Sequence, residues 1–175
     1  MTPPKPPAAG KVVSLEALVA VLAPERRLGR KVVFTNGCYD LLHVGHLRLL
    51  ETAAALGDLL VVGVNRDTSV FRLKGEGRPF VPFAERAELL AALEVVDWVV
   101  GFDDDTPAET IDVLVPDVLV KGGDWSVDKI VGRDTVEAHG GKVLSIPLVP
   151  GRSTTSLVER IRSARGGAAP PGTRS

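Results

Sequence analysis

Short apolar runs alternate with segments of helical spacing along most of the chain. The run at 31–36 (Lys-Val-Val-Phe-Thr-Asn) has the length and β-branched content of a buried strand. The segment at 47–56 has helical apolar spacing and stops at Gly57. Ser14 is predicted to cap the first helix and Pro24 to end it. Strands are predicted at 31–36, 58–65, 97–100, 117–121 and 142–146, and helices at 14–23, 47–56, 67–72, 83–93, 107–114, 133–139 and 153–162.

This alternation predicts an α/β fold: a Rossmann-like, doubly wound, five-stranded parallel sheet. Continuous apolar strands are typical of a sheet that is buried on both faces, and right-handed crossovers place helices on both sides. The simplest order puts strand 31–36 in the centre with strand 117–121 beside it, and ligands then bind at the carboxyl ends of these strands. We predict one domain at 11–164, between flexible tails at 1–10 and 165–175.

Composition narrows the class of protein. The 175 residues carry a formal net charge of −1, with 45% hydrophobic and 25% charged residues, so neither nucleic acid nor membrane is a predicted partner. The N-terminus lacks the charged-then-apolar order of a signal peptide, and no apolar run approaches the roughly 20 residues of a membrane span. The single cysteine, Cys38, excludes an intrachain disulfide. These features predict a cytoplasmic protein.

Two histidines follow the first predicted strand and open the next helix. His43 and His46 are three residues apart and can share one helix face, while Gly45 lets a phosphate approach the backbone. Free amides at the helix start add donors and partial positive charge. A zinc site needs three or four protein ligands, and no further His or Cys cluster stands nearby, so no metal site is predicted. The predicted catalytic residues here are His43 and His46, and the predicted nucleotide-binding residues are Thr35, Asn36, Gly37, Tyr39, Asp40 and Gly45.

The sequence resembles a known family at this point. His43-Val44-Gly45-His46 matches the His-x-Gly-His signature of a nucleotidyltransferase superfamily, and 34–46 resembles its cytidylyltransferase-like branch. That branch usually has Phe where this chain has Tyr39. Within it, the chain resembles the D-glycero-β-D-manno-heptose 1-phosphate adenylyltransferases, the ADP-heptose synthase domain. The similar segments lie at 73–79, 91–100, 105–107, 116–124 and 153–156 and together span about 14–163.

Two later segments supply further candidates. Lys121 ends the strand predicted beside 31–36, so we expect it to reach the nucleotide, although a plain loop lysine is the alternative. The resemblance implies that Lys121, Gly122 and Asp124 line the site. Hydroxyls and free amides at the start of the last helix suit phosphate oxygens, with simple helix capping as the alternative. The resemblance implies nucleotide-phosphate contacts for Ser153, Thr154, Thr155 and Ser156.

The loop at 74–79 combines two glycines with two cations, Lys74 and Arg78, which suits a mobile lid over an anionic substrate. Arg86, in the following helix, is predicted to reach a phosphate; its alternative is an ion pair with Glu85 or Glu88. Asp40 could orient a histidine, touch magnesium through water or bind substrate, or only form a turn.

The resemblance implies transfer of AMP from ATP, with Mg²⁺, to the heptose 1-phosphate, giving ADP-heptose and pyrophosphate. Two alternatives stay open: a CTP-dependent enzyme acting on glycerol 3-phosphate, and a nucleotide-binding module without catalysis. The expected partners are a nucleoside triphosphate and a sugar 1-phosphate, and a homodimer is left open. A dinucleotide dehydrogenase is disfavoured because no Gly-x-Gly-x-x-Gly follows the first strand.

Overall fold

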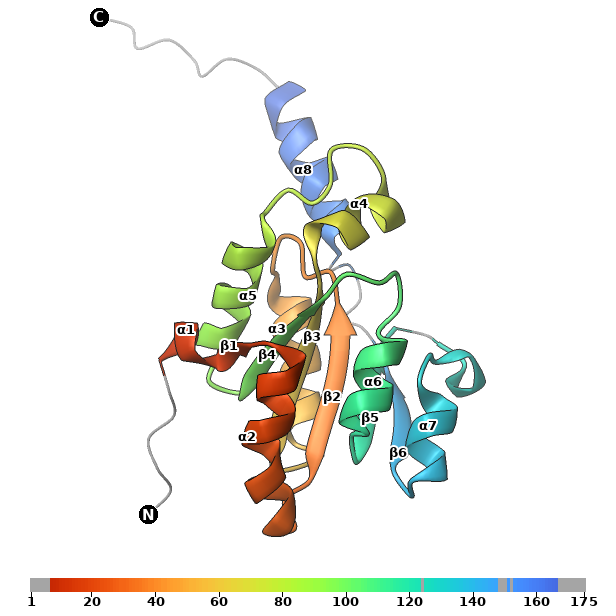
Figure 1. The fold of residues 1–175 in the computed structure, drawn as a ribbon. Helices are drawn as coiled ribbons and strands as arrows, with labels where there is room; N and C mark the ends of the chain where they lie inside the picture. The colour runs from red at the N-terminus through yellow and green to blue at the C-terminus, as the bar shows by residue number, and fades with distance from the viewer. Residues whose placement is uncertain (1–6, 124, 148–150, 152, 167–175) are drawn as a thin grey trace, which may run out of the picture.

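The computed structural model describes residues 7–123, 125–147, 151 and 153–166. Its centre is a six-stranded parallel sheet in the order β1-β4-β3-β2-β5-β6 (Figure 1). The strands are β1 (Val12–Val13), β2 (Val32–Gly37), β3 (Leu59–Asn65), β4 (Trp98–Phe102), β5 (Val118–Gly122) and β6 (Lys142–Ile146). The helices are α1 (Ala8–Lys11), α2 (Leu15–Arg27), α3 (Val44–Ala54), α4 (Asp67–Lys74), α5 (Phe83–Ala92), α6 (Ala108–Leu114), the 3₁₀ helix η1 (Val127–Lys129), α7 (Arg133–Ala138) and α8 (Thr154–Gly166).

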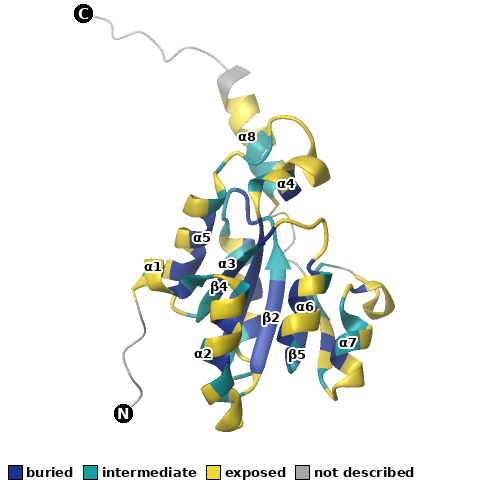
Figure 2. Ribbon diagram, in the orientation of Figure 1, coloured by how far each residue is buried: buried dark blue, intermediate teal, exposed yellow. Residues whose placement is uncertain are grey.

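Helices cover both faces of the sheet, because alternate residues of each central strand point to opposite sides. On one face Val33 packs in a buried cluster with Leu50 of α3 and Leu90 of α5. On the other face its neighbour Phe34 packs in a second cluster that includes Ile111 of α6. Figure 2 shows the central strands as buried between these layers. The predicted Rossmann-like α/β class is therefore confirmed.

The predicted strand order is confirmed, but the predicted number of strands is wrong by one. Strand β2 lies between β3 and β5, as expected for the strand predicted at 31–36. The additional strand is β1, which pairs with β4 through Val12 opposite Val99 and Val13 opposite Val100. Two residues are too short to give a strand pattern in the sequence. The missed strand lies at one edge of the sheet, so it does not alter the ligand-binding crevice.

Three predicted boundaries also shift. Residues 8–10, predicted as tail, belong to α1, and the Lys11 ammonium donates to the carbonyl of Val96 at 2.9 Å. Helix α2 continues through Pro24 to Arg27. Proline removes only one helical hydrogen bond here, and the last turn is anchored because Arg26 donates to the carbonyl of Leu114 at 2.5 Å. Helix α8 continues to Gly166, and residues 1–6 and 167–175 of the predicted tails lie outside the described residues.

Carboxylates set the start of several strands. An aspartate lies just before β3, β4 and β5, and its side chain accepts the main-chain N–H of a residue at the start of the neighbouring strand. The pairs are Asp58 with Lys31, Asp97 with Leu60 and Asp117 with Val32, each at 2.8 Å. These bonds hold the amino ends of the strands in register, at the end opposite the predicted ligand site. No helix within the described residues is long and apolar enough to cross a membrane.

Candidate functional site

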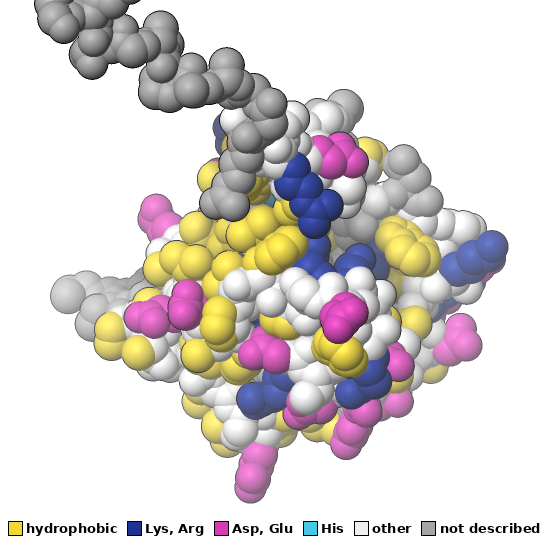
Figure 3. Space-filling view, turned by 90° about the horizontal axis from the view of Figure 1, so that it is seen from above, with side chains coloured by type: hydrophobic (Ala, Val, Ile, Leu, Met, Phe, Trp, Pro, Cys, Tyr) yellow, Lys and Arg dark blue, Asp and Glu magenta, His cyan; other side chains and the backbone are white. Residues whose placement is uncertain are grey.

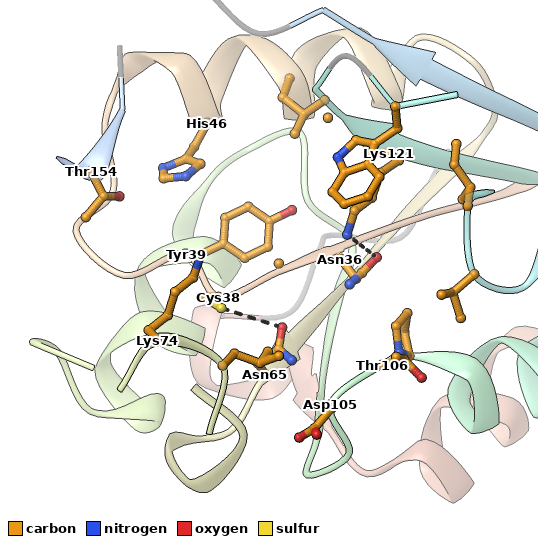
Figure 4. Close-up of a pocket in the computed structure, with 18 of the residues that line it drawn as sticks. Asn36, Cys38, Tyr39, His46, Asn65, Lys74, Asp105, Thr106, Lys121 and Thr154 are labelled. Atoms are coloured by element: carbon orange, nitrogen blue, oxygen red, sulfur yellow. Dashed lines mark hydrogen bonds between the residues drawn. The ribbon is translucent and has the colours of Figure 1, made fainter. Parts of the chain in front are cut away.

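A cavity of about 550 Å³ lies at the carboxyl ends of β2, β3 and β5, where the fold rule places ligands (Figure 4). Figure 3 looks down on this end of the molecule, where Lys and Arg side chains gather around a hollow. Predicted site residues that line the cavity are Asn36, Gly37, Tyr39, His43, His46, Lys74, Lys121, Gly122, Ser153 and Thr154. The structure thus brings together segments that are more than 100 residues apart in the sequence.

The two histidines are oriented by the main chain of their own helix. Helix α3 begins at Val44, with His43 as its N-cap: His43 Nδ1 accepts the N–H of Gly45 at 3.1 Å. His46 Nδ1 in turn lies 3.4 Å from the N–H of His43. The rings are stacked, with centroids 3.9 Å apart and planes inclined by 18°. Because each Nδ1 faces a donor, each neutral ring carries its proton on Nε2 and is a hydrogen-bond donor there.

Burial keeps His46 neutral. Burial, and to a lesser extent repulsion from the adjacent His43, lower the pKa of His46 to about 4. At neutral pH His46 therefore offers a neutral N–H, which donates to negative charge without first having to lose a solvation shell. This suits stabilisation of a phosphate oxygen more than proton abstraction.

Tyr39 packs against the second histidine of this pair. Its ring meets His46 edge-on, with centroids 5.3 Å apart, and only 4% of the residue is exposed. Burial raises the pKa of the Tyr39 phenol, and the neighbouring Thr35 hydroxyl acts in the opposite direction. Gly37 lies so close that a Cβ there would come within 3.2 Å of the Tyr39 ring. Thr35 and the buried Gly45 lie beneath the cavity and do not line it.

Lys121 bridges the crevice between two strands. It projects from the end of β5, and its Nζ lies 3.4 Å from Asn36 Oδ1 on β2 (Figure 4). The same ammonium lies 5.9 Å from the centre of the Trp125 ring. Burial lowers the pKa of Lys121 from its ordinary value of 10.5. The lysine is thus a partly desolvated charge in the cavity that His43 and His46 also line (these two residues are called the histidine cradle below). The strand order predicted this position for Lys121.

Of the four hydroxyl residues at 153–156 that were predicted to contact phosphate, only two reach the cavity. Ser153 and Thr154 line it. The Ser153 hydroxyl accepts the N–H of Ser156 at 3.1 Å, so Ser153 caps α8 as the alternative interpretation held. Ser156 Oγ bonds back to the N–H of Ser153 at 3.2 Å, and Thr155 is exposed away from the lining. Two residues, not four, are therefore placed to contact a phosphate.

Asp40 was predicted to contact the nucleotide, but the structure places its side chain away from the cavity. Only 2% of the residue is exposed, and it does not line the cavity. Its carboxylate accepts the N–H groups of Phe80 at 2.9 Å and Val81 at 3.0 Å and pairs with Arg78 Nε at 2.7 Å. A carboxylate with three donors around it, at the back of the loop, holds the chain and not a ligand. Arg78, predicted to bind phosphate, is likewise turned to Asp40, and its guanidinium lies 4.5 Å over the Phe80 ring.

Arg86, predicted to reach a phosphate, likewise lies outside the cavity lining. Only 1% of Arg86 is exposed, and its guanidinium donates to the carbonyls of Cys38, Asn65 and Val81. It also pairs with Asp67 at 2.7 Å, so the alternative of a surface pair within its own helix is wrong as well. Because its donors are occupied by the chain, Arg86 joins three loop segments beneath the cavity and does not reach a phosphate. Asp124, another predicted ligand contact, lies outside the described residues.

Several cavity residues were not predicted. Asn65 at the end of β3 and Asp105, Thr106 and Pro107 after β4 lie where the rule for strand ends places ligands, as do the predicted residues of β2 and β5. Those not anticipated as site residues are Cys38, Leu49, Asn65, Leu73, Asp105, Thr106, Pro107, Trp125, Lys129, Ile130 and Val131. Burial raises the pKa of the Cys38 thiol, which disfavours the reactive thiolate form. Among the described residues, no group of three or more His, Cys, Asp or Glu could hold a metal ion.

A parallel sheet that ends in a paired-histidine cradle defines an α/β nucleotidyltransferase. The chain belongs to the cytidylyltransferase-like family, whose model matches residues 34–160. It is 55% identical over 154 residues to the bifunctional protein HldE of Citrifermentans bemidjiense. The aligned region covers 88% of this chain and 32% of that protein. It is 58% identical over 151 residues to HldE of Syntrophotalea carbinolica, at 86% and 31% coverage. The chain thus spans about a third of these relatives.

A solved structure gives the same fold. The crystal structure of the lipopolysaccharide core biosynthesis protein from Thermoplasma volcanium GSS1 superposes with a TM-score of 0.57 at 30% identity. The match covers 69% of this chain and 98% of that one.

Proposed function

We propose that this domain transfers AMP from ATP to D-glycero-β-D-manno-heptose 1-phosphate, giving ADP-heptose and pyrophosphate. The observation that carries the reaction class is the stacked His43–His46 pair facing the same cavity as Lys121 and Thr154. The choice of acceptor rests on the resemblance in the segments at 73–79 and 116–124, together with the high identity to HldE proteins.

In the proposed step a phosphate oxygen of the sugar 1-phosphate attacks the α-phosphorus of ATP in line. The new P–O bond forms as the bond from the α-phosphorus to the bridging oxygen of the β-phosphate breaks, and pyrophosphate leaves with that electron pair. The acceptor phosphate is already ionised at neutral pH, so no strong base is required. The Nε2–H groups of His43 and His46 and the ammonium of Lys121 stabilise the charge that grows on the α-phosphate oxygens.

Mg²⁺ fits this cavity as an ion carried by the nucleotide. Asp105 is the carboxylate among the described lining residues, and it is already bonded to Arg72 Nε at 2.7 Å. Magnesium prefers phosphate oxygens and water over a dedicated protein cage. When bound it would neutralise part of the triphosphate charge, while the chain supplies the donors described above.

The remaining proposals concern the setting of the reaction. Both substrates are charged phosphate esters that do not cross a bilayer unaided, so we place the reaction in the cytoplasm. A homodimer stays a prediction, and sedimentation equilibrium of the purified chain tests it.

Pyrophosphate release measured across a grid of donors and acceptors tests the function. We expect kcat/KM with ATP to exceed that with CTP by at least about tenfold, roughly 1.4 kcal/mol of differential transition-state binding, with the heptose 1-phosphate as acceptor. A preference for CTP with glycerol 3-phosphate would select the cytidylyltransferase alternative. Nucleotide binding without pyrophosphate release from any pair would select the non-catalytic module.

A further inference from the structure

Asp40 contacts two separate edges of the cavity at once. Its carboxylate holds the loop between α4 and α5 through Arg78, Phe80 and Val81. Its main-chain carbonyl accepts the hydroxyl of Thr154, at the start of α8, at 2.9 Å. One buried residue therefore holds two segments of the chain, one at Phe80, which is 40 positions after Asp40, and one at Thr154, which is 114 positions after it.

The loop held by Asp40 begins at a cavity lysine. Lys74 ends α4 and lines the cavity, and Figure 4 shows it on the same side as His46 and Thr154. Gly75 and Gly77 follow with φ values of 86° and 77°, a region that glycine enters freely. Without a fixed far end, such a glycine-containing loop could carry Lys74 into many positions. The three bonds to Asp40 supply that fixed end at 78–81.

The backbone around Asp40 is itself constrained. Tyr39 and Leu41 have φ values of 50° and 61°, which cost energy for residues with side chains and persist only when the surroundings impose them. A buried carboxylate needs donors to offset its lost hydration, and here a guanidinium and two amides provide them. Asparagine could accept some of these bonds, but its NH₂ would face donors and its charge would be absent.

We infer that Asp40 is a positioning residue that fixes Lys74 and the first main-chain N–H groups of α8, at Thr154, at the spacing needed to hold one polyphosphate between them. The carboxylate does not touch the ligand; it acts through the loop at 75–82, while the main-chain carbonyl of Asp40 holds Thr154 at the start of α8. The kinetic part of the inference rests on the proposed function, but the binding part does not, since inorganic tripolyphosphate presents the same oxygens without a base or sugar.

Calorimetric titration with tripolyphosphate tests the binding part on Asp40→Asn. The matched control is Asp117→Asn, whose carboxylate also accepts a distant main-chain N–H but at the opposite end of the sheet. We expect the Kd to rise on the order of tenfold or more in Asp40→Asn and to stay at the wild-type value in Asp117→Asn. Trypsin should cut faster after the exposed Lys74 in Asp40→Asn alone. Equal affinity and equal cutting in all three proteins would overturn the inference, as would a wild-type protein that does not bind tripolyphosphate.

A double-mutant cycle separates positioning from loss of stability. If Asp40 acts through Lys74, Asp40→Asn should cost little further affinity once Lys74→Met is present, whereas independent effects would add and would overturn the inference. Arg78→Met leaves the cavity lining intact and should show the same non-additivity with Lys74→Met. It replaces Asp40→Asn in the cycle if Asp40→Asn does not fold. In kinetics, KM for ATP should rise more than kcat falls. Tripolyphosphate binding that depends on Asp40, without pyrophosphate release from any substrate pair, would reject the proposed function and keep this inference.

Discussion

The imidazole of His43 lies flat against that of His46, with ring centroids 3.9 Å apart, and both rings take their orientation from main-chain N–H groups of the same helical turn. In many catalytic sites a carboxylate orients a histidine and raises its basicity. Here the orienting groups are amides, which present their hydrogen atoms to Nδ1 and leave the ring proton on Nε2. The pair is therefore arranged to donate toward an anion, which matches a reaction whose nucleophile needs no base.

His46→Ala should lower kcat for pyrophosphate release on the order of 10²-fold, the loss typical of one transition-state donor, with a smaller change in nucleotide affinity. The matched control is His139→Ala, because His139 is exposed at the end of α7 and its Nδ1 lies 2.7 Å from the carbonyl of Thr135. Steady-state kinetics on both variants checks this. A folded His46→Ala protein with wild-type kcat would remove His46 from the reaction.

The lowered pKa of His46 predicts how stability depends on pH. The folded-state pKa of about 4 lies below the ordinary value of 6.5, so between these values the unfolded chain binds a proton that the folded chain does not. Stability from this group is therefore complete above about pH 6.5 and is lost as pH falls toward 4. The stability of wild type relative to His46→Gln should decline over that window, as measured by chemical denaturation at a series of pH values. A constant difference would mean that His46 titrates normally.

The layer structure could be predicted because it follows from local patterns. Buried strands such as 31–36 are continuous apolar runs, right-handed crossovers place the helices on the two faces, and the simplest doubly wound order makes 117–121 the neighbour of 31–36. The placement of Lys121 across the crevice from Asn36 follows from that order alone. The cradle was visible for a similar reason, since His43 and His46 are neighbours in one helical turn.

The roles of Asp40 and Arg86 could not be predicted, because their partners come from distant loops. A charged residue beside a phosphate-binding motif has the same sequence signature whether it faces the ligand or the protein interior. Burial decides between these roles, and here it is nearly complete for both side chains. Several of their partners are main-chain groups, such as the N–H of Phe80 and the carbonyl of Val81, which carry no side-chain signal in the sequence.

Val115→Gly should stabilise the domain. Val115 ends α6 in the left-handed conformation, with φ of 42° and ψ of 70°, where a β-branched residue costs about 1–2 kcal/mol and glycine is preferred. After the extra entropy that glycine loses on folding, we expect a gain of up to about 1 kcal/mol. The control is Val113→Gly, at an exposed position inside the same helix, which should destabilise by several tenths of a kcal/mol. Denaturant titration distinguishes the two, and a loss of stability in Val115→Gly would contradict the prediction.

Lys121→Met tests charge supply in the cavity, because methionine is similar in length but neutral. The ammonium is already held 3.4 Å from Asn36 Oδ1 and partly desolvated, so it is organised before the reaction begins. We therefore expect kcat to fall by about tenfold or more while KM for ATP changes less. The exposed Lys142, at the opposite end of the sheet, gives the control variant Lys142→Met, which should keep wild-type constants.

The pH profile adds a second readout for Lys121. Since burial lowers the pKa of Lys121, the charged form is lost as pH rises through a value below 10.5, and kcat of the wild type should decline on that alkaline side. The decline should be absent from Lys121→Met, whose rate has already lost the charge. A rise in KM alone would assign Lys121 to ground-state binding of the triphosphate, since uniform binding alters KM and leaves kcat unchanged. If Lys121→Met kept the wild-type kcat and KM and still showed the decline of kcat at high pH, Lys121 would have no role in the site.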